Sequence, residues 1–261
     1  MRISLLISTY ERPDALAAVL RSVSRQSLAP DEVIVGDDGS GPETAAVLAA
    51  AKGIPVLRHE WRAHDGFRLS RSRNIAIASA AGDYLVIIDD DILLHPDFIA
   101  DHAAAAKPGF FVQGSRVILD EGISRRATEA DAFWPFLLSG GVSNRKNLIR
   151  SLFLSRLFGR PAAGIRKIRT CNFAVWRDDC VRVNGFNEDF VGWGREDSEF
   201  VTRLGNAGVR RRNLRFAALG CHLHHPLRSR DALEHNDVLL AETTADKSRI
   251  RCENGLNLHQ A

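Results

Sequence analysis

Apolar runs alternate with segments of helical periodicity along the N-terminal third of the chain. Residues 2–8 and 33–36 are continuous apolar runs, and between positions 16 and 23 apolar side chains recur at the spacing of one helix face. The alternation continues with predicted helices at 44–52 and 70–81 and predicted extended segments at 54–58 and 84–88. Strands that are apolar throughout and interleaved with helices are typical of a parallel sheet covered on both faces. We therefore predict an α/β fold with a mainly parallel central sheet flanked by helices.

The pattern becomes mixed beyond about residue 110. We predict further elements as a strand at 111–117, a strand at 173–176, a helix at 177–183 and a turn at Asn184-Gly185, and leave 120–169 unassigned. The sequence shows no internal repeat. We therefore predict one domain over residues 1–230, made of the halves 1–110 and 111–230, followed by a C-terminal tail at 231–261.

Acidic residues follow two of the predicted strands. Asp37 and Asp38 follow one, and Asp89, Asp90 and Asp91 follow the other. Ligands of parallel sheets bind at the carboxyl ends of the strands, so we expect both clusters in one crevice. Adjacent carboxylates repel one another unless a cation compensates them, and a hard divalent metal is the natural partner. The alternative is helix capping, which explains one aspartate well and three poorly.

The bulk composition is that of an ordinary globular protein. The chain has 261 residues, 45% of them hydrophobic, and a net charge of +3 that does not indicate a nucleic-acid partner. No window reaches the roughly 20 apolar residues that span a bilayer, and the N-terminal apolar run is too short for a signal peptide. Four cysteines without CxxC spacing indicate reduced thiols rather than a disulfide or a zinc site. We therefore predict a cytoplasmic protein.

A loop around Trp193 combines an aromatic ring with acids. Gly192 and Gly194 flank the tryptophan and permit a tight turn that exposes the indole, and apolar faces of sugars stack on such rings. Glu196 and Asp197 follow and offer a base beside this platform. The alternative is a buried tryptophan followed by an acidic helix start, in which the two acids interact favourably with the helix dipole.

Two further motifs carry histidine and arginine. His222 and His224 are two positions apart, so in an extended segment they share one face and could reach one cation; the alternative is a solvated loop. Arg71, with Arg73 and Asn74 behind it, opens the helix before the aspartate strand and suits an anionic ligand. A solvated basic helix face is the alternative there.

A basic insertion at 140–169 contains no acid. Its apolar residues from Leu148 to Phe158 recur at helical spacing, with arginines on other faces. This pattern suits a helix that lies on an anionic membrane surface. A lid over a substrate and an amphipathic helix packed on the core are the alternatives.

The segments 8–12, 35–40 and 89–91 together resemble glycosyltransferase family 2, which has the GT-A (nucleotide-diphospho-sugar transferase) fold. The resemblance implies that residues 1–110 bind the nucleotide sugar and residues 111–230 the acceptor. It implies that Asp38 and Thr9 flank the nucleoside, that Asp89 faces the ribose or sugar, and that Asp91 binds metal, although the division among the three aspartates stays open. The other donor-binding residues implied are Tyr10, Arg12, Arg71, Asn74 and Asp90.

The loop at 192–197 resembles the GWGxED motif of β-1,4-galactosyltransferases and bacterial polysaccharide-polymerising transferases. That resemblance implies Asp197 as the catalytic base, and Trp193, Gly194 and Glu196 as acceptor-binding residues. Arg195 departs from the small residue that these relatives often carry, which leaves the acceptor open.

The histidine pair resembles a metal-binding element in one branch of the same relatives. It implies Asp91, His222 and His224 as ligands. The mixture of imidazole, carboxylate and phosphate oxygen suits Mn²⁺, with Mg²⁺ as the alternative.

The resulting hypothesis is a metal-dependent inverting hexosyltransferase. It moves a sugar from a nucleotide diphosphate donor, expected to be a UDP-sugar, to a hydroxyl of a cell-surface glycan or glycolipid. We expect a location in the cytoplasm, with peripheral association at the inner face of the membrane through residues 144–169. The competing hypotheses are an inactive carbohydrate-binding protein on the same fold and a nucleotidyltransferase, which would release pyrophosphate.

Overall fold

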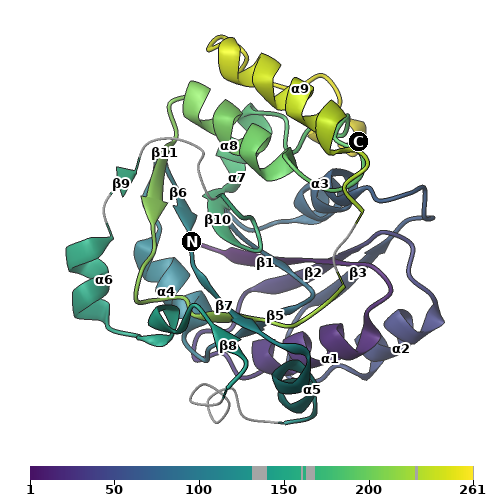
Figure 1. Cartoon of the computed structure of the whole chain (residues 1–261), viewed down its shortest axis with the longest axis vertical. Coiled ribbons are helices and arrows are strands. Elements are labelled where there is room, and N and C mark those ends of the chain that lie inside the picture. Colours follow the sequence, from purple (N-terminus) through teal and green to yellow (C-terminus); the bar gives the residue numbers. More distant parts are fainter. Residues whose placement is uncertain (131–139, 160, 163–167, 227–228, 261) are drawn as a thin grey trace.

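The computed structural model describes the whole chain except residues 131–139, 160, 163–167, 227–228 and 261. Its described part is an α/β structure with a large, mostly parallel sheet between two helical layers, so the predicted fold class is confirmed (Figure 1). None of the helices in these described ranges is long and apolar enough to cross a membrane.

The strands form two sheets. The larger has the spatial order β3 (Leu57–Trp61), β2 (Glu32–Asp37), β1 (Ile3–Thr9), β4 (Tyr84–Asp89), β10 (Asn172–Trp176), β6 (Phe110–Gln113), β11 (Arg210–Asn213) and β9 (Pro161–Ala162). The smaller has the order β5 (Ile92–Leu94), β12 (Gly220–His222), β7 (Arg116–Leu119) and β8 (Val142–Ser143).

Helices cover both faces of the larger sheet (Figure 1). The helices of the described residues are α1 (Pro13–Val23), α2 (Pro42–Ala50), α3 (Leu69–Ser79), α4 (Phe98–Ala105), α5 (Glu121–Glu129), α6 (Leu152–Phe158), α7 (Arg177–Arg182), α8 (Glu196–Asn206) and α9 (Leu233–Ala245), with short 3₁₀ helices η1 (Arg145–Leu148) and η2 (Leu256–Leu258). Side chains of α1 and α4 share one apolar cluster with the sheet, and those of α3 and α8 share the other.

The three central parallel strands bring the acidic clusters to one edge. All residues of β1 and β2 are buried, as the continuous apolar pattern predicts for strands covered on both faces. In the parallel register, Thr9 pairs with Asp37, and Ser8 pairs with Asp89. The carboxyl ends of β1, β2 and β4 therefore lie side by side, where open α/β sheets bind ligands.

Helix α3 packs unusually close to β2. A Cβ atom at Gly36 would lie 2.5 Å from the backbone oxygen of Ser72, so only glycine permits this approach. The Ser72 hydroxyl donates a hydrogen bond to the Gly36 carbonyl at 2.7 Å. This contact fixes the depth of the helix that carries Arg71, Arg73 and Asn74.

The second half departs from the parallel pattern. Strand β10 runs antiparallel to β4, and the strand predicted at 111–117 is two strands, β6 and β7, which belong to different sheets. The break follows Gln113: the Gly114 amide donates to the Asn172 carbonyl, and the chain then crosses to pair with β12. Tertiary pairing thus divides an apolar run that looks continuous in the sequence.

The C-terminal segment expected as a tail packs on the domain. Helix α9 lies against α8, and Leu256 of η2 is 1% exposed. The Asn184 amide donates to the Cys252 carbonyl and to Asn257, which ties this segment to the turn after α7. All four cysteines are buried free thiols, as expected.

Candidate active site

Asp90 and Asp91 lie beside the first strand, at the carboxyl edge of the sheet. The Thr9 hydroxyl donates to Asp90 at 2.7 Å, and the Arg12 guanidinium lies 2.7 Å from Asp91 and 3.4 Å from Asp90. Burial, together with the neighbouring Asp91, raises the pKa of Asp90 to about 7. Thr9 and Arg12, expected at the donor, thus hold these two carboxylates in the structure.

Asp38 lies at the end of β2, where its side chain is 7% exposed. The backbone amide of Arg68 donates to its carboxylate at 3.0 Å, and burial raises its pKa. Arg71 interacts favourably with this carboxylate. The rings of Tyr10 and His64 stack with centroids 4.3 Å apart, and His64 contacts the Asp38 backbone. An acid and a flat aromatic pair therefore lie where β1 and β2 end.

Arg73 joins the aspartate strand to the acidic loop. Its guanidinium lies 3.0 Å from Asp89 and 2.9 Å from Asp197, and its side chain is 2% exposed. Burial alone would lower the pKa of Arg73, but the surrounding carboxylates of Asp197, Asp89 and Glu196 raise it, so the group is charged. The acids of the two motifs, more than a hundred residues apart in the sequence, thus meet at one cation.

Asp197 is held from two sides. Thr170 donates to it through both its hydroxyl and its backbone amide, the latter at 3.0 Å, while Arg73 contacts the same carboxylate. The side chain still exposes 18% of its area. These donors fix the carboxylate in one orientation and leave it accessible, as a general base requires.

Glu196 precedes Asp197 in the first turn of α8 and is 8% exposed. One of its carboxylate oxygens is buried with no hydrogen-bond partner among the described residues. Burial and the adjacent Asp197 raise the pKa of Glu196 to about 7. Glu196 and Asp197 both lie in the first turn of α8, as the alternative of an acidic helix start predicted.

Trp193 is exposed on the loop before α8, with 41% of its surface accessible, so the alternative of a buried tryptophan is wrong. Gly192, Gly194 and Arg195 all have positive φ angles, which produce the tight turn. Asn236 of α9 donates to the Gly194 carbonyl at 2.9 Å, and the Arg230 guanidinium lies 5.5 Å from the indole. The ring is therefore presented at the surface beside a cation.

Three potential metal ligands lie together at the junction of the two sheets. Ligand atoms of Asp91, His222 and His225 all lie within 4.8 Å of one another. One oxygen of Asp91 is buried and has no hydrogen-bond partner among the described residues, although His222 is 3.6 Å away. Burial lowers the pKa of His222 to about 4, so its ring is neutral at neutral pH and offers a lone pair. An unpaired carboxylate oxygen beside a neutral imidazole fits a divalent cation.

This cluster differs from the expected ligands at one position. His225, not His224, lies beside Asp91, at 3.5 Å. His224 is exposed, and its backbone amide donates to Ser124. Strand β12 ends at His222, so the two-residue alternation on which the expectation depended does not continue to position 224.

Asn74 supports the site from within the core. It is fully buried, and its amide contacts the Phe186 backbone twice, at 2.8 Å, and Glu188 at 2.8 Å. Its hydrogen-bonding groups are thereby used by the protein itself. Expected as a donor-binding residue, Asn74 instead fixes the loop between α7 and α8.

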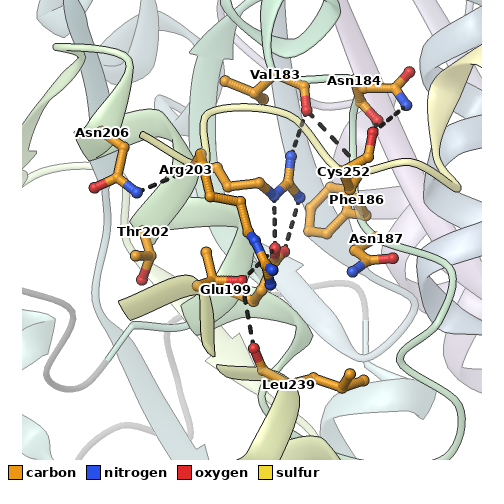
Figure 2. A network of polar contacts seen from close by, with 12 residues as sticks. Val183, Asn184, Phe186, Asn187, Glu199, Thr202, Arg203, Asn206, Leu239 and Cys252 are labelled. Carbon is orange, nitrogen blue, oxygen red and sulfur yellow. Dashed lines mark hydrogen bonds and ion pairs between the residues drawn. The ribbon is translucent and has the colours of Figure 1, made fainter. Parts of the chain in front are cut away.

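A buried ion pair supports the same loop from the other side. Arg203 and Glu199 are 0% and 1% exposed at the side chain and form two hydrogen bonds, at 2.7 and 2.8 Å (Figure 2). Arg203 also donates to the carbonyls of Val183 and Gly185. The pair thus fixes the turn that leads to Phe186, whose ring lies 5.1 Å from the Arg73 guanidinium.

Arg116 was not singled out in the sequence. Its guanidinium donates to the Cys171 thiol at 3.1 Å and interacts with Asp89 and Asp91. Sulfur is a weak acceptor, so among the described contacts this cation keeps donors for an anionic ligand. Its position at the start of an apolar segment could have indicated it, because a charge next to buried residues needs a partner.

Family models cover most of the chain. Residues 4–155 match glycosyl transferase family 2, and residues 156–226 match the N-terminal domain of galactosyltransferase. Validoxylamine A glucosyltransferase of Streptomyces hygroscopicus subsp. limoneus is 28% identical over 230 residues, 79% of this chain and 48% of that protein. Chondroitin synthase of Escherichia coli is 24% identical over 245 residues, 86% of this chain and 35% of that protein. The chain therefore spans about half the length of these relatives, or less.

Solved structures share the fold. S. aureus TarS 1–349 in complex with UDP superimposes with a TM-score of 0.65 at 17% identity, over 96% of this chain and 69% of that one. The complex of the same protein with UDP-GlcNAc gives 0.62 at 16% identity, over 96% and 70%. The resemblance found in the sequence is thus confirmed, and the protein belongs to glycosyltransferase family 2.

Proposed function

We propose that this protein transfers a sugar, with inversion, from a UDP-sugar to a hydroxyl of a cell-surface glycan or glycolipid. The observation that carries the proposal is the ion-paired cluster in which Arg73 contacts both Asp89 and Asp197. This cluster unites the acids of the donor motif and of the acceptor motif. The TarS complexes with UDP and UDP-GlcNAc support a uridine nucleotide as the donor.

On the donor side, Asp38 and the stacked Tyr10 receive the nucleoside at the ends of β1 and β2. The Asp38 carboxylate accepts hydrogen bonds, and the ring offers a flat surface for the base. Arg71 interacts with Asp38, Arg116 interacts with Asp89 and Asp91, and both cations bind the diphosphate in this proposal.

Asp91, His222 and His225 would hold a divalent cation. When bound, such a cation neutralises the negative charge that grows on the departing diphosphate. Two imidazoles and one carboxylate favour Mn²⁺, with Mg²⁺ as the alternative.

On the acceptor side, Trp193 stacks on the acceptor sugar and Glu196 binds one of its hydroxyls. Asp197 takes the proton from the attacking hydroxyl. The oxygen then forms a bond to the anomeric carbon, while the bond between that carbon and the diphosphate oxygen breaks and its electron pair leaves with the diphosphate. Attack opposite the leaving group inverts the anomeric configuration, and the protein forms no covalent intermediate.

A panel of nucleotide sugars with Mn²⁺, assayed for release of nucleoside diphosphate and followed by NMR of the product, tests the proposal. We expect UDP release with one donor and a product of inverted anomeric configuration. Release of pyrophosphate would indicate a nucleotidyltransferase. Binding of UDP-sugars without turnover for any acceptor would indicate a carbohydrate-binding protein. Retained configuration would remove Asp197 from the role of base.

A further inference from the structure

Five large apolar side chains are exposed on and beside helix α6. These side chains, which we call the α6 surface, are 47% to 74% exposed: Ile149, Leu152, Phe153, Leu157 and Phe158. Helix α6 lies at the periphery of the molecule, far from α8 and α9 (Figure 1). The structure therefore does not bury these five side chains on the described core, as a core-packed amphipathic helix would require. Arg160, Arg166 and Lys167 of the basic insertion lie outside the described residues.

The helix has the reverse of the usual amphipathic pattern. Its buried residue is Ser155, at 8% exposure, whereas Phe153 is 74% exposed. The helix is attached through polar groups: the Ser151 amide donates to the Phe216 carbonyl at 2.9 Å, and the Ser151 hydroxyl caps the helix by accepting from Leu154. A surface helix in water normally turns its apolar side chains inward, so this arrangement indicates an apolar partner for the outer face.

Cations accompany the exposed apolar side chains. Arg156 is exposed and follows Leu152 by four positions and Phe153 by three, so it lies between them on the helix. Lys146 of η1 and Arg215 are also exposed, and Arg215 precedes Phe216, whose ring lies 5.9 Å from that of Phe158. The sequence contains no acid between Asp131 and Asp178. The α6 surface is therefore apolar and positively charged, without local anions from its own segment.

We propose that the α6 surface docks on an anionic phospholipid bilayer. Phe153 and Leu157 enter the boundary between headgroups and acyl chains, and Arg156 reaches the lipid phosphates beside them. The exposed cations favour a bilayer over a protein partner or a second copy of the chain. Apolar contact with a protein needs no surrounding positive charge, whereas an anionic lipid leaflet attracts positive charge. This inference goes beyond the proposed sugar transfer and does not depend on it. It places the acceptor at the membrane, where a glycolipid is available.

Co-sedimentation with lipid vesicles tests the inference, without donor or acceptor. We expect the full chain to bind vesicles of phosphatidylglycerol mixed with phosphatidylcholine, and to bind phosphatidylcholine alone more weakly. The double variant Phe153→Ser, Leu157→Ser should lower the partition coefficient by about tenfold or more. Arg156→Ser should lower it about fivefold, because one cation near the surface contributes about 1 kcal/mol. Added salt should weaken binding of the wild type.

Val238→Ser on α9 is the matched control, because Val238 is 55% exposed on a distant helix and should leave binding unchanged. Thermal unfolding verifies that all variants are folded. We expect them to fold, because the substituted side chains are exposed. Equal binding of wild type and α6 variants, or no binding to anionic vesicles, would overturn the inference. So would a dimer in light scattering that the double variant converts to a monomer, since a second copy would then cover the surface.

Discussion

The guanidinium of Arg73 lies 2.9 Å from the carboxylate of Asp197, and the arginine side chain is 2% exposed whereas that of Asp197 is 18% exposed. The same side chain contacts Asp89 at 3.0 Å, so one planar cation sets the distance between Asp89 and Asp197, the proposed base. A lysine keeps the charge but has no second nitrogen for the second acid.

Arg73→Lys should therefore reduce kcat about 100-fold, because small displacements of a reacting group are costly. The KM for the donor should change less than kcat, since the contact of Arg73 with Asp89 is altered but the contacts of Asp38 are untouched. Steady-state UDP release measures both constants. A loss confined to KM would show that Arg73 binds the donor and does not position the base.

The proposed metal site offers two nearby histidines as variant and control. His225→Gln should weaken Mn²⁺ activation at least tenfold, since it removes a proposed ligand beside Asp91. His224→Gln should leave it unchanged, because that side chain is exposed and is not part of the group that Asp91, His222 and His225 form. Transfer activity measured against Mn²⁺ concentration, and Mn²⁺ binding measured by calorimetry, compare the two variants. The reverse order of effects would restore His224 as the ligand.

His102 makes the fold sensitive to acid. It is a fully buried residue of α4 whose ring contacts Asn172 at 2.9 Å, and burial lowers its pKa to about 4. The native state then binds fewer protons than the unfolded chain, so stability from this group is complete above about pH 6.5 and is lost as the pH falls toward 4. The loss should reach about 3 kcal/mol, at 1.36 kcal/mol per pKa unit.

His102→Gln keeps an amide beside Asn172 but does not titrate. Urea unfolding of both proteins between pH 7 and 4 should show a smaller decrease in the free energy of unfolding for the variant. Parallel curves would contradict the assignment of this acid sensitivity to His102.

The buried ion pair of Arg203 and Glu199 should contribute far more to the free energy of unfolding than a surface ion pair of the same type. Glu199→Gln leaves the Arg203 charge buried without its carboxylate, which should cost about 3–5 kcal/mol of unfolding free energy. Glu242→Gln is the control: its partner Arg249 is 41% exposed, so the loss should stay below about 1 kcal/mol. Urea denaturation measures both, and equal losses would contradict the structural role of the buried pair.

The sequence predicted the parts of the site that follow from strand periodicity. Asp38 and Asp89 end apolar strands, and the carboxyl ends of neighbouring parallel strands meet at one edge, so their proximity was predictable. The loop around Trp193 was predictable because glycines bracket it and the motif is specific.

The rest depends on tertiary contacts that leave no local pattern. His225 approaches Asp91 only because β12 ends at His222, and periodicity cannot show where a strand stops. Arg73 lies on the buried face of α3, where a charge is not expected without knowledge of its partners in other elements. The region after residue 110 was weakly patterned because its strands are short and divided between two sheets.

The measurement that tests the central claim most directly combines calorimetry of UDP-sugar binding with the rate of sugar transfer for Asp197→Asn. Asparagine retains the size of the side chain and an acceptor for Thr170 but cannot take a proton. We predict donor affinity equal to that of the wild type and a transfer rate at least about 100-fold lower. Transfer at the wild-type rate, or loss of donor binding, would contradict the assignment of Asp197 as the base.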